Sequence, residues 1–137
     1  MIILDTCVVT EAVRTPPDPK VLNWLDQLPE ERVYLPSLVL GELHKGVELL
    51  EEGNKKSALR LLLEQLQERF HERILYFDEE TALSWGMLTA RLEKSGRTLP
   101  VIDGMLAATA LQHSALFATR NRIDYEGTGI EILDPWE

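Results

Sequence analysis

Four carboxylates that are far apart in the sequence stand where helix or strand ends could bring them to one point: Asp5, Glu42, Asp103 and Asp124. Two carboxylates about 4 Å apart repel each other by roughly 4 kcal/mol at an effective dielectric constant near 20, so a shared site requires a cation. Hard oxygen ligands suit Mg²⁺ or Mn²⁺, which keep several waters and bind one or two carboxylates together with phosphate oxygens. One cysteine and scattered histidines make zinc a poor fit. The pattern predicts an acidic, metal-dependent active site.

Two of these acids follow short apolar runs. The run Met1 to Asp5 (MIILD) stops at its acid, and the run Leu116 to Thr119 (LFAT) leads into the polar loop RNRIDYEG, which contains Asn121 and Asp124. Continuous apolar runs of this length are typical of buried parallel strands. In open α/β sheets, ligands bind outside the carboxyl ends of the strands. Both segments are therefore expected to place their polar residues at the rim of a sheet.

Glu42 lies in a predicted helix, Ser37 to Glu52, which begins at a Ser cap behind Pro36 and stops before Gly53. Because each helical residue advances roughly 100°, Glu42 lies nearly opposite His44 on the polar face and beside the apolar residues of the segment. Its carboxylate is therefore expected to point inward or into a cleft.

Asp103 opens a second predicted helix, Ile102 to His113. Apolar residues follow it at spacings of three, four and seven, so its carboxylate lines up with the buried stripe of the helix: Leu106, Ala107 and Ala110.

The other elements alternate between short strands and helices, which predicts an α/β fold with a mostly parallel sheet flanked by helices. No repeat or long linker divides the chain, so one domain over residues 1–137 is expected. The second strand is predicted to be followed by a helical hairpin whose second helix buries its leucine stripe in the core. The remaining predicted strands are Arg32 to Leu35, Ile74 to Phe77 and Ile130 to Leu133, and the remaining helices are Val21 to Leu28, Lys55 to Phe70 and a segment from an Asp78 cap to near Gly96.

Each acid also has a purely structural alternative. Asp5 could cap the turn that follows it, Asp103 could stabilise the positive end of a helix dipole, and Asn121 and Asp124 are ordinary turn formers. Glu42 is the hardest to explain in this way, because an inward carboxylate is rare unless it is paired or binds a ligand. The four positions together are more specific than any one of them.

Composition limits the class of protein. A chain of 137 residues that is 45% hydrophobic suits a folded domain with a core. No apolar run reaches the roughly 18 residues that span a bilayer, and no basic segment precedes a signal-like core, so a cytoplasmic protein that does not enter the membrane is expected. The formal charge of −9 opposes a broad nucleic-acid footprint, so phosphate contact would depend on a local basic rim. The residues that could form that rim, although each is more simply explained as a solvated surface charge, are Arg14, Lys20, Arg91, Lys94, Arg97, Arg120 and Arg122.

Other hydrolytic chemistries fail on residue spacing. A cysteine phosphatase needs C-x5-R in a glycine-rich loop, but Cys7 and Arg14 are separated by six residues without glycine. A phosphatase of the haloacid dehalogenase type needs a second Asp two residues after the first, where Cys7 stands. The three histidines have no evident Ser or Cys partner. The three tryptophans are expected to be core or interface anchors, and none is assigned to stacking on a base.

The whole chain resembles the PIN-domain ribonucleases of the VapC toxin type. The resemblance rests on MIILDTCVVTE, LVLGELHKGVELL, IDGMLAATA, ATRNRIDY and the closing ILDPWE. By position it implies that Asp5, Glu42 and Asp103 fill three acidic places of the family. The fourth place falls at Asn121 instead of an acid, and Asp124 is the acid nearby. The expected fold is a PIN-like three-layer α/β/α arrangement.

The resemblance further implies a Mg²⁺- or Mn²⁺-dependent endoribonuclease that acts on RNA, forms a homodimer and is held inactive by a VapB-like antitoxin. Apolar surface on the early helices could receive an antitoxin helix, and a basic antitoxin side chain could enter the acidic pocket. Asp5 and Asp103 are expected to hold the principal metal, with Glu42 acting directly or through water and Asp124 as a further ligand. A metal-activated water would then attack the phosphodiester in line. Asn121 could coordinate or position a water.

Thr6 could donate a hydrogen bond that orients a carboxylate or a phosphate oxygen, although capping the next helix is an equally good role. The main alternative function is a catalytically weak or silent PIN-fold module that acts with a DNA-binding, antitoxin-like partner. Asn121 and the acidic net charge favour that alternative.

Overall fold

The computed structural model describes residues 1–137 and is built around a sheet of five strands in the order β3-β2-β1-β4-β5. All four strand pairings are parallel. The strands are short and apolar because helices cover both faces of the sheet. Each predicted strand is confirmed to within two residues: β1 Ile2–Leu4, β2 Val33–Pro36, β3 Ile74–Leu75, β4 Leu116–Ala118 and β5 Glu131–Leu133.

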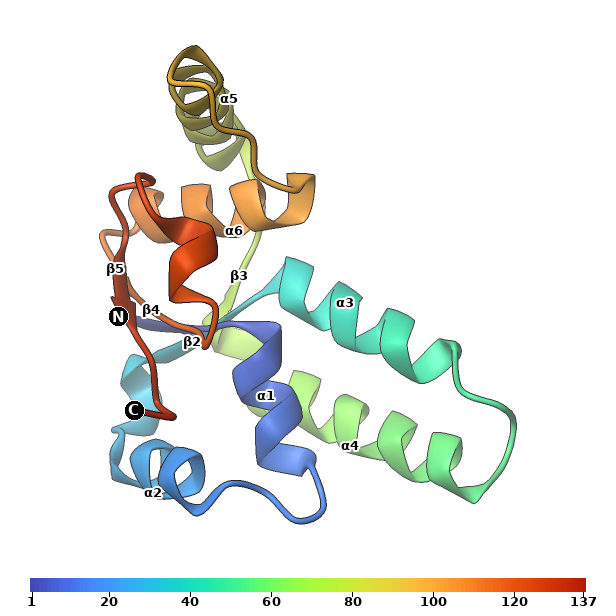
Figure 1. Ribbon diagram of the computed structural model, residues 1–137. Coiled ribbons are helices and arrows are strands. Elements are labelled where there is room, and N and C mark those ends of the chain that lie inside the picture. Colours follow the sequence, from blue (N-terminus) through green and yellow to red (C-terminus); the bar gives the residue numbers. More distant parts are fainter.

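Six α-helices connect these strands (Figure 1). The segment after β4, which was predicted to be a loop, instead contains a short 3-10 helix that begins after Asn121. The α-helices are α1 Thr6–Val13, α2 Pro19–Gln27, α3 Ser37–Glu48, α4 Asn54–Arg69, α5 Glu79–Lys94 and α6 Val101–Gln112, and the 3-10 helices are η1 Glu30–Arg32, η2 His71–Arg73 and η3 Arg122–Tyr125.

The strands following β1 are added to the sheet first on one side of β1 and then on the other. From β1 the chain proceeds through β2 to the edge strand β3, and it then returns to β4 on the other side of β1. Because such crossovers are right-handed, α1 to α4 lie on one face of the sheet while α5 and α6 lie on the other, as Figure 1 shows. The predicted three-layer arrangement is confirmed. The carboxyl ends of β1 and β4 form the point at which the connections diverge, where open α/β sheets bind ligands.

The core lies on both sides of the central strands. Ile3 in β1 and Phe117 in β4 are fully buried, and they are joined by Leu35 from β2, Val8 from α1 and Leu106 from α6. These side chains come from elements that are distant in the sequence. Their packing fixes the ends of β1 and β4 relative to the first turns of α1 and α6.

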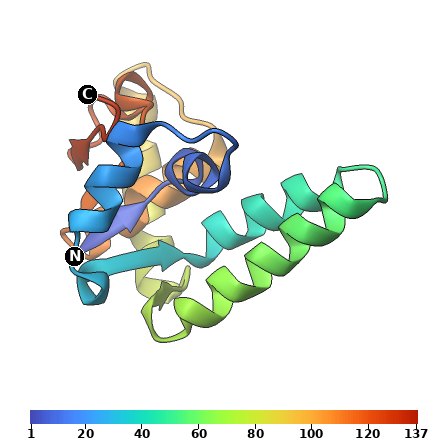
Figure 2. The same cartoon turned by 90° about the horizontal axis from the view of Figure 1, so that it is seen from below.

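The predicted helical hairpin is confirmed: α3 and α4 run antiparallel and project from the body of the domain (Figure 2). The first helix is shorter than expected, because α3 ends at Glu48 and not at Glu52. Its N-cap is Pro36, without a side-chain cap bond, so the predicted cap at Ser37 is wrong. The turn is closed by Lys56, whose Nζ donates to the Glu48 carbonyl at 3.2 Å and to Glu52 Oε1 at 2.9 Å.

The leucine stripe of α4 is not core, contrary to the expectation. Phe70, just after the helix, is buried, but Leu62 is 44% exposed and Leu59, Leu63 and Leu66 are only partly buried. The hairpin extends beyond the sheet, so this chain covers the stripe only in part, with Leu66 packed against the core. These leucines line an apolar groove of about 250 Å³, named here the hairpin groove, together with Val9 and Val13 of α1 and Leu43 and Val47 of α3.

In the layer formed by α5 and α6, the structure agrees more closely with the sequence-based predictions. Asp78 caps α5 as predicted, with Oδ1 accepting hydrogen bonds from the Thr81 amide and hydroxyl at 2.9 and 2.8 Å. Gly96, at φ +80°, adopts the left-handed conformation just after the helix. Helix α6 packs against α5 at Gly104, where an added Cβ would lie 3.2 Å from Trp85 Nε1. No helix has the length and apolar character needed to cross a membrane.

Candidate active site

Three of the predicted acids line one pocket. Asp5, Glu42 and Asp103 come from the end of β1, the middle of α3 and the first turn of α6, and they share a cavity of about 430 Å³ with Asn121. We call this cavity the acidic pocket. It lies at the diverging carboxyl ends of β1 and β4, where the topology predicts a binding site.

Asp5 is held on both carboxylate oxygens. Its Oδ1 accepts from the Thr6 amide at 2.8 Å and its Oδ2 accepts from the Thr119 hydroxyl at 2.7 Å. The first bond caps α1, so the capping role considered for Asp5 is real and coexists with its place in the pocket. The second bond ties the end of β1 to the end of β4. Because Asp5 is only 6% exposed, these bonds fix its orientation.

Glu42 is oriented by Thr6. The Thr6 hydroxyl donates to Glu42 Oε1 at 2.9 Å, across 36 positions of sequence. This contact confirms the carboxylate-orienting role expected of Thr6. Glu42 is partly buried while His44 is exposed, as the helical spacing predicted. One residue, Thr6, therefore connects the start of α1 to the carboxylate of α3.

Asp103 carries the electrostatic signature of the acidic pocket. Its pKa is raised above the usual value, first by partial burial and then by the negative charges of Asp5, Asp124 and Glu42, while the Tyr125 side chain acts in the opposite direction. Its position in the first turn of α6 provides a favourable helix dipole. The carboxylates of the pocket thus repel one another, and a bound cation would relieve this repulsion.

Two residues, Asn121 and Asp124, were considered for the fourth acidic position of the site. Asn121, directly before η3, lines the acidic pocket, whereas Asp124 in η3 does not line it; both side chains are exposed. Asp124 is close enough for its charge to raise the pKa of Asp103. The structure therefore brings together four of the five predicted site residues and leaves Asp124 outside as a neighbouring charge.

The oxygen atoms that line the pocket suit a Mg²⁺ or Mn²⁺ ion that keeps some of its waters. They do not suit a cation whose ligands all come from the protein. No group of three or more histidine, cysteine, aspartate or glutamate side chains is arranged to hold a metal ion by itself. Asp5 and Glu42 are instead each tied to a threonine hydroxyl. Mg²⁺ keeps several waters and needs only one or two direct carboxylates, which this pocket can supply. The individual metal ligands stay a prediction.

Comparisons with known proteins agree with this geometry. The family model described as the PIN domain matches residues 2–126. The chain belongs to the PIN domain family. It is 39% identical to toxin FitB of Neisseria gonorrhoeae over 99% of both chains, and 34% identical to the VapC ribonuclease Y4jK of Sinorhizobium fredii over 100% of this chain and 99% of the relative. A solved structure of FitAB bound to an IR36 DNA fragment matches with a TM-score of 0.94 at 38% identity, covering 100% of this chain and 96% of that one. The resemblance seen in the sequence is confirmed.

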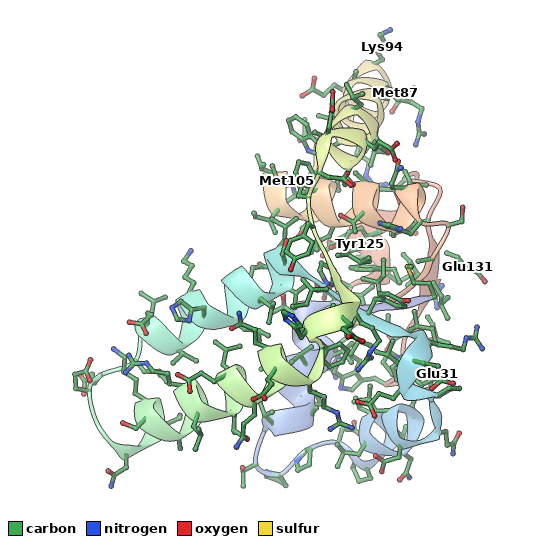
Figure 3. All side chains as sticks on the ribbon, turned by 180° about the vertical axis from the view of Figure 1, so that it is seen from behind. Glu31, Met87, Lys94, Met105, Tyr125 and Glu131 are labelled. Atoms are coloured by element: carbon green, nitrogen blue, oxygen red, sulfur yellow. The ribbon has the colours of Figure 1, made fainter.

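Two side chains of this PIN domain site were missed by the sequence reasoning. Thr119 is fully buried, and its hydroxyl donates to Asp5. Its Oγ1 also accepts from the backbone amide of Asn121 at 3.1 Å. Tyr125 is buried beneath α6 (Figure 3), and its pKa is raised first by burial and then by Asp5 and Asp103, so its hydroxyl stays protonated. The signal for Thr119 was present, because a hydroxyl at the end of a strand beside β1 can reach an acid at the end of β1.

Only a small part of the possible basic rim is found at the acidic pocket. Arg97 donates to the carbonyls of Ile123 and Asp124 at 3.0 Å, and Arg91 donates to the carbonyls of Gly127 and Thr128 at 3.0 and 3.1 Å, so both support the segment around η3. Lys94 lies on α5, far from the hairpin (Figure 3). Of the seven candidates, only Arg14 and Arg120 line the acidic pocket of the PIN domain.

Proposed function

We propose that this PIN domain is a Mg²⁺- or Mn²⁺-dependent endoribonuclease and the toxin of a toxin–antitoxin pair. The observation that carries the proposal is the shared pocket of Asp5, Glu42 and Asp103 at the diverging strand ends. Relatives that match nearly the full chain are named toxin and ribonuclease, which supports the same activity.

Each residue has a distinct role in the proposed reaction. Asp5 and Asp103 would hold the cation, with Glu42 bound directly or through water. A bound divalent cation supplies polarisation of the phosphodiester and a lowered pKa for an attacking water. Thr119 and Thr6 fix the orientation of the Asp5 and Glu42 carboxylates, and the Asn121 amide positions water or a phosphate oxygen without adding charge.

The decisive experiment compares the purified, partner-free chain with Asp5→Asn on structured and unstructured RNAs in manganese and in EDTA. We expect cleavage only by the parent protein and only with the metal. Melting curves of both proteins show whether the variant is folded. Equal cleavage by parent and variant would identify a contaminating nuclease and reject the proposal.

We also propose that the hairpin groove binds an apolar segment of an antitoxin. The groove is lined almost entirely by aliphatic side chains, and Leu62 and Val13 are each 44% exposed. An amphipathic helix of a partner would bury these side chains. The relative FitB is seen in a FitAB assembly, which supports a partner on this fold.

A homodimer is proposed through the outer face of α5. Leu83 and Met87, one helical turn apart, are 65% and 76% exposed. Figure 3 labels Met87 on α5. Exposed apolar side chains of this size are typical of interaction surfaces. Light scattering of the parent and of Met87→Glu tests this: a monomeric parent protein would refute the dimer.

A silent PIN module remains the second candidate, because Asn121 replaces an acid and the carboxylates do not form a ready-made ligand shell. That module would act with a DNA-binding partner, as the DNA-bound FitAB assembly illustrates. Thermal melting with and without manganese separates the two candidates. A metal-binding site raises the Tm through linkage, and Asp103→Asn removes the rise. No rise in the parent protein would favour the silent module.

A further inference from the structure

The acidic pocket has an electrostatic problem that its carboxylates cannot solve. An RNA phosphodiester is an anion and must approach Asp5, Glu42 and Asp103 in a chain whose formal charge is −9. Proteins that bind RNA neutralise phosphates with Lys or Arg. The proposed divalent cation would offset part of this charge, and a Lys or Arg on the wall of the pocket would add a direct contact to the phosphate.

Arg120 is the cation best placed to supply that contact. It directly follows Thr119, which holds Asp5, and it lines the acidic pocket. No carboxylate lies within salt-bridge distance of its guanidinium, whereas Arg14 contacts Glu11 Oε1 at 3.5 Å and Arg122 contacts Glu137 at 3.9 Å. Arg120 is thus the pocket arginine whose charge is not already used by the protein.

Trp136 fixes the position of Arg120. The guanidinium carbon lies 4.8 Å from the centre of the Trp136 ring, within the range of a cation–π interaction. Trp136 is anchored at two points. The indole Nε1 donates to Glu11 Oε1 at 3.1 Å, and the backbone amide of Trp136 donates to Asp134 Oδ1 at 2.8 Å. The Arg120 guanidinium therefore lies against one face of an anchored indole ring.

Glu11 supplies the last connection, and its burial needs an explanation. The residue is 4% exposed on α1, and its Oε2 is buried without a hydrogen-bond partner. Burying a carboxylate that is only partly satisfied is costly. Its other oxygen, Oε1, accepts from the indole nitrogen of Trp136 at 3.1 Å and lies 3.5 Å from the Arg14 guanidinium, so Glu11 ties both side chains to α1.

We propose that Arg120 contacts the RNA phosphate next to the cleaved bond, and that Trp136 and Glu11 are positioning residues that hold its guanidinium at the acidic pocket. The inference rests on the proposed ribonuclease function and adds the substrate-binding side of the same site. Within the acidic pocket, Arg120 provides a positive charge that an RNA phosphate can contact directly.

The test measures binding of a fluorescein-labelled single-stranded RNA over a range of salt concentrations, together with cleavage kinetics in manganese. Arg120→Gln should raise the KM roughly ten- to hundredfold, as expected for a lost charge-assisted hydrogen bond, while kcat changes little. The slope of log K against log salt should become shallower by about 0.7, the value for one phosphate contact on a single strand. Lys94→Gln removes the same charge from the far end of α5 and should change neither quantity.

The positioning role has its own readout. Trp136→Leu should raise the KM roughly two- to fivefold, the range of an exposed cation–π interaction, and should have no further effect in an Arg120→Gln background. Trp136→Phe keeps a ring but lacks the donor to Glu11, so a smaller increase is expected. Arg120→Lys should restore the salt slope. Melting curves identify any variant that has lost its fold.

Two outcomes would overturn the inference. One is an unchanged KM and salt slope in Arg120→Gln, and the other is equal changes in Arg120→Gln and Lys94→Gln. An effect of Arg120→Gln on antitoxin binding alone would assign the residue to the partner. If the parent protein does not cleave RNA, the proposed function fails, but the salt slope of RNA binding still decides whether Arg120 contacts phosphate.

Discussion

The acidic pocket and the hairpin groove share two helices and differ in almost every physical property. Helix α1 presents Thr10 and Glu11 to the pocket but Val9 and Val13 to the groove. The pocket collects charges that repel one another and holds them with specific hydrogen bonds. The groove collects aliphatic side chains that this chain covers only in part.

The same division occurs between adjacent residues of α3, where Glu42 lines the pocket and Leu43 lines the groove. Helical geometry makes this possible, because neighbouring residues face directions about 100° apart. One helix can therefore orient a carboxylate for chemistry and provide an apolar surface for a partner. The comparison teaches that substitutions in the pocket should change activity, while those in the groove should change partner binding and leave activity intact.

The largest expected effect comes from the same substitution at two points of α3. Glu42→Gln should lower manganese-dependent cleavage by roughly a hundredfold or more, since weakening even the outer contacts of a metal site costs 10- to 100-fold. Glu48→Gln, near the hairpin turn and about half exposed, should leave the cleavage rate unchanged. Initial rates on one RNA measure both. Similar losses in the two variants would show that the effect of Glu42→Gln is not specific to the acidic pocket.

Next in size is the loss of the hydroxyl that holds Asp5. Thr119→Val should destabilise the fold by about 1–3 kcal/mol, because a buried carboxylate oxygen loses its donor, and it should also reduce cleavage. The matched control is Thr109→Val, equally buried, whose hydroxyl donates to the Met105 carbonyl within α6. Urea unfolding should show a much smaller loss for the control. Equal losses would mean that the hydroxyl of Thr119 has no special role.

A smaller effect, of opposite sign, is expected from charge repulsion in the metal-free pocket. The pKa of Asp103 is raised in the folded protein, so the native state binds more protons than the unfolded chain, and stability falls as the pH rises through that pKa. In EDTA at neutral pH, Asp103→Asn should therefore raise the Tm by roughly 2–4 °C, with little gain near pH 4.

Asp124→Asn, which removes a weaker source of the same repulsion outside the pocket, should give a smaller rise. Differential scanning calorimetry at the two pH values measures all three proteins. A lower Tm for Asp103→Asn than for the parent at neutral pH would show that the pocket is not destabilised by its charges.

The smallest effect on the isolated protein is expected in the groove. Leu62→Asp should change stability by no more than about 0.5 kcal/mol, because the side chain is already exposed. It should nevertheless weaken binding of the cognate antitoxin and leave cleavage intact. Leu61→Asp is the control, since Leu61 is 55% exposed and does not line the groove. Titration calorimetry with the antitoxin should separate the two; equal binding by both variants would exclude the groove as the docking surface.

Much of the fold could be predicted because its signals are local. Asp78 capping α5, Gly96 after the end of that helix and the apolar strand runs depend on neighbours in sequence, and the structure agrees with them. The predictions that failed depended on distant partners. The stripe of α4 has the spacing of a core helix, but the hairpin carries it past the edge of the sheet. Arg91 and Arg97 donate hydrogen bonds to backbone carbonyls, and sequence spacing does not reveal these contacts.

In the site, too, the contacts between residues distant in sequence could not be predicted. The choice of Asp5, Glu42 and Asp103 followed from residue type and helical or strand period, which a sequence displays directly. The hydroxyls that orient these acids, from Thr6 and Thr119, act on partners 36 and 114 positions away. Trp136 meets Glu11 and Arg120 for the same reason, because the end of the chain folds back over α1.

The amino-acid sequence by itself determined which carboxylates exist, the elements that carry them and the alternation of strand and helix, since these depend on local preference and periodicity. Tertiary structure decided which charges meet, which hydroxyls hold them, that Asp124 stays outside the pocket and that the leucines of α4 remain partly uncovered. The physical reason is that hydrogen bonds and charge repulsion act over a few ångströms in space, and only the packing of β1 against β4, with α3 and α6 beside them, sets those distances.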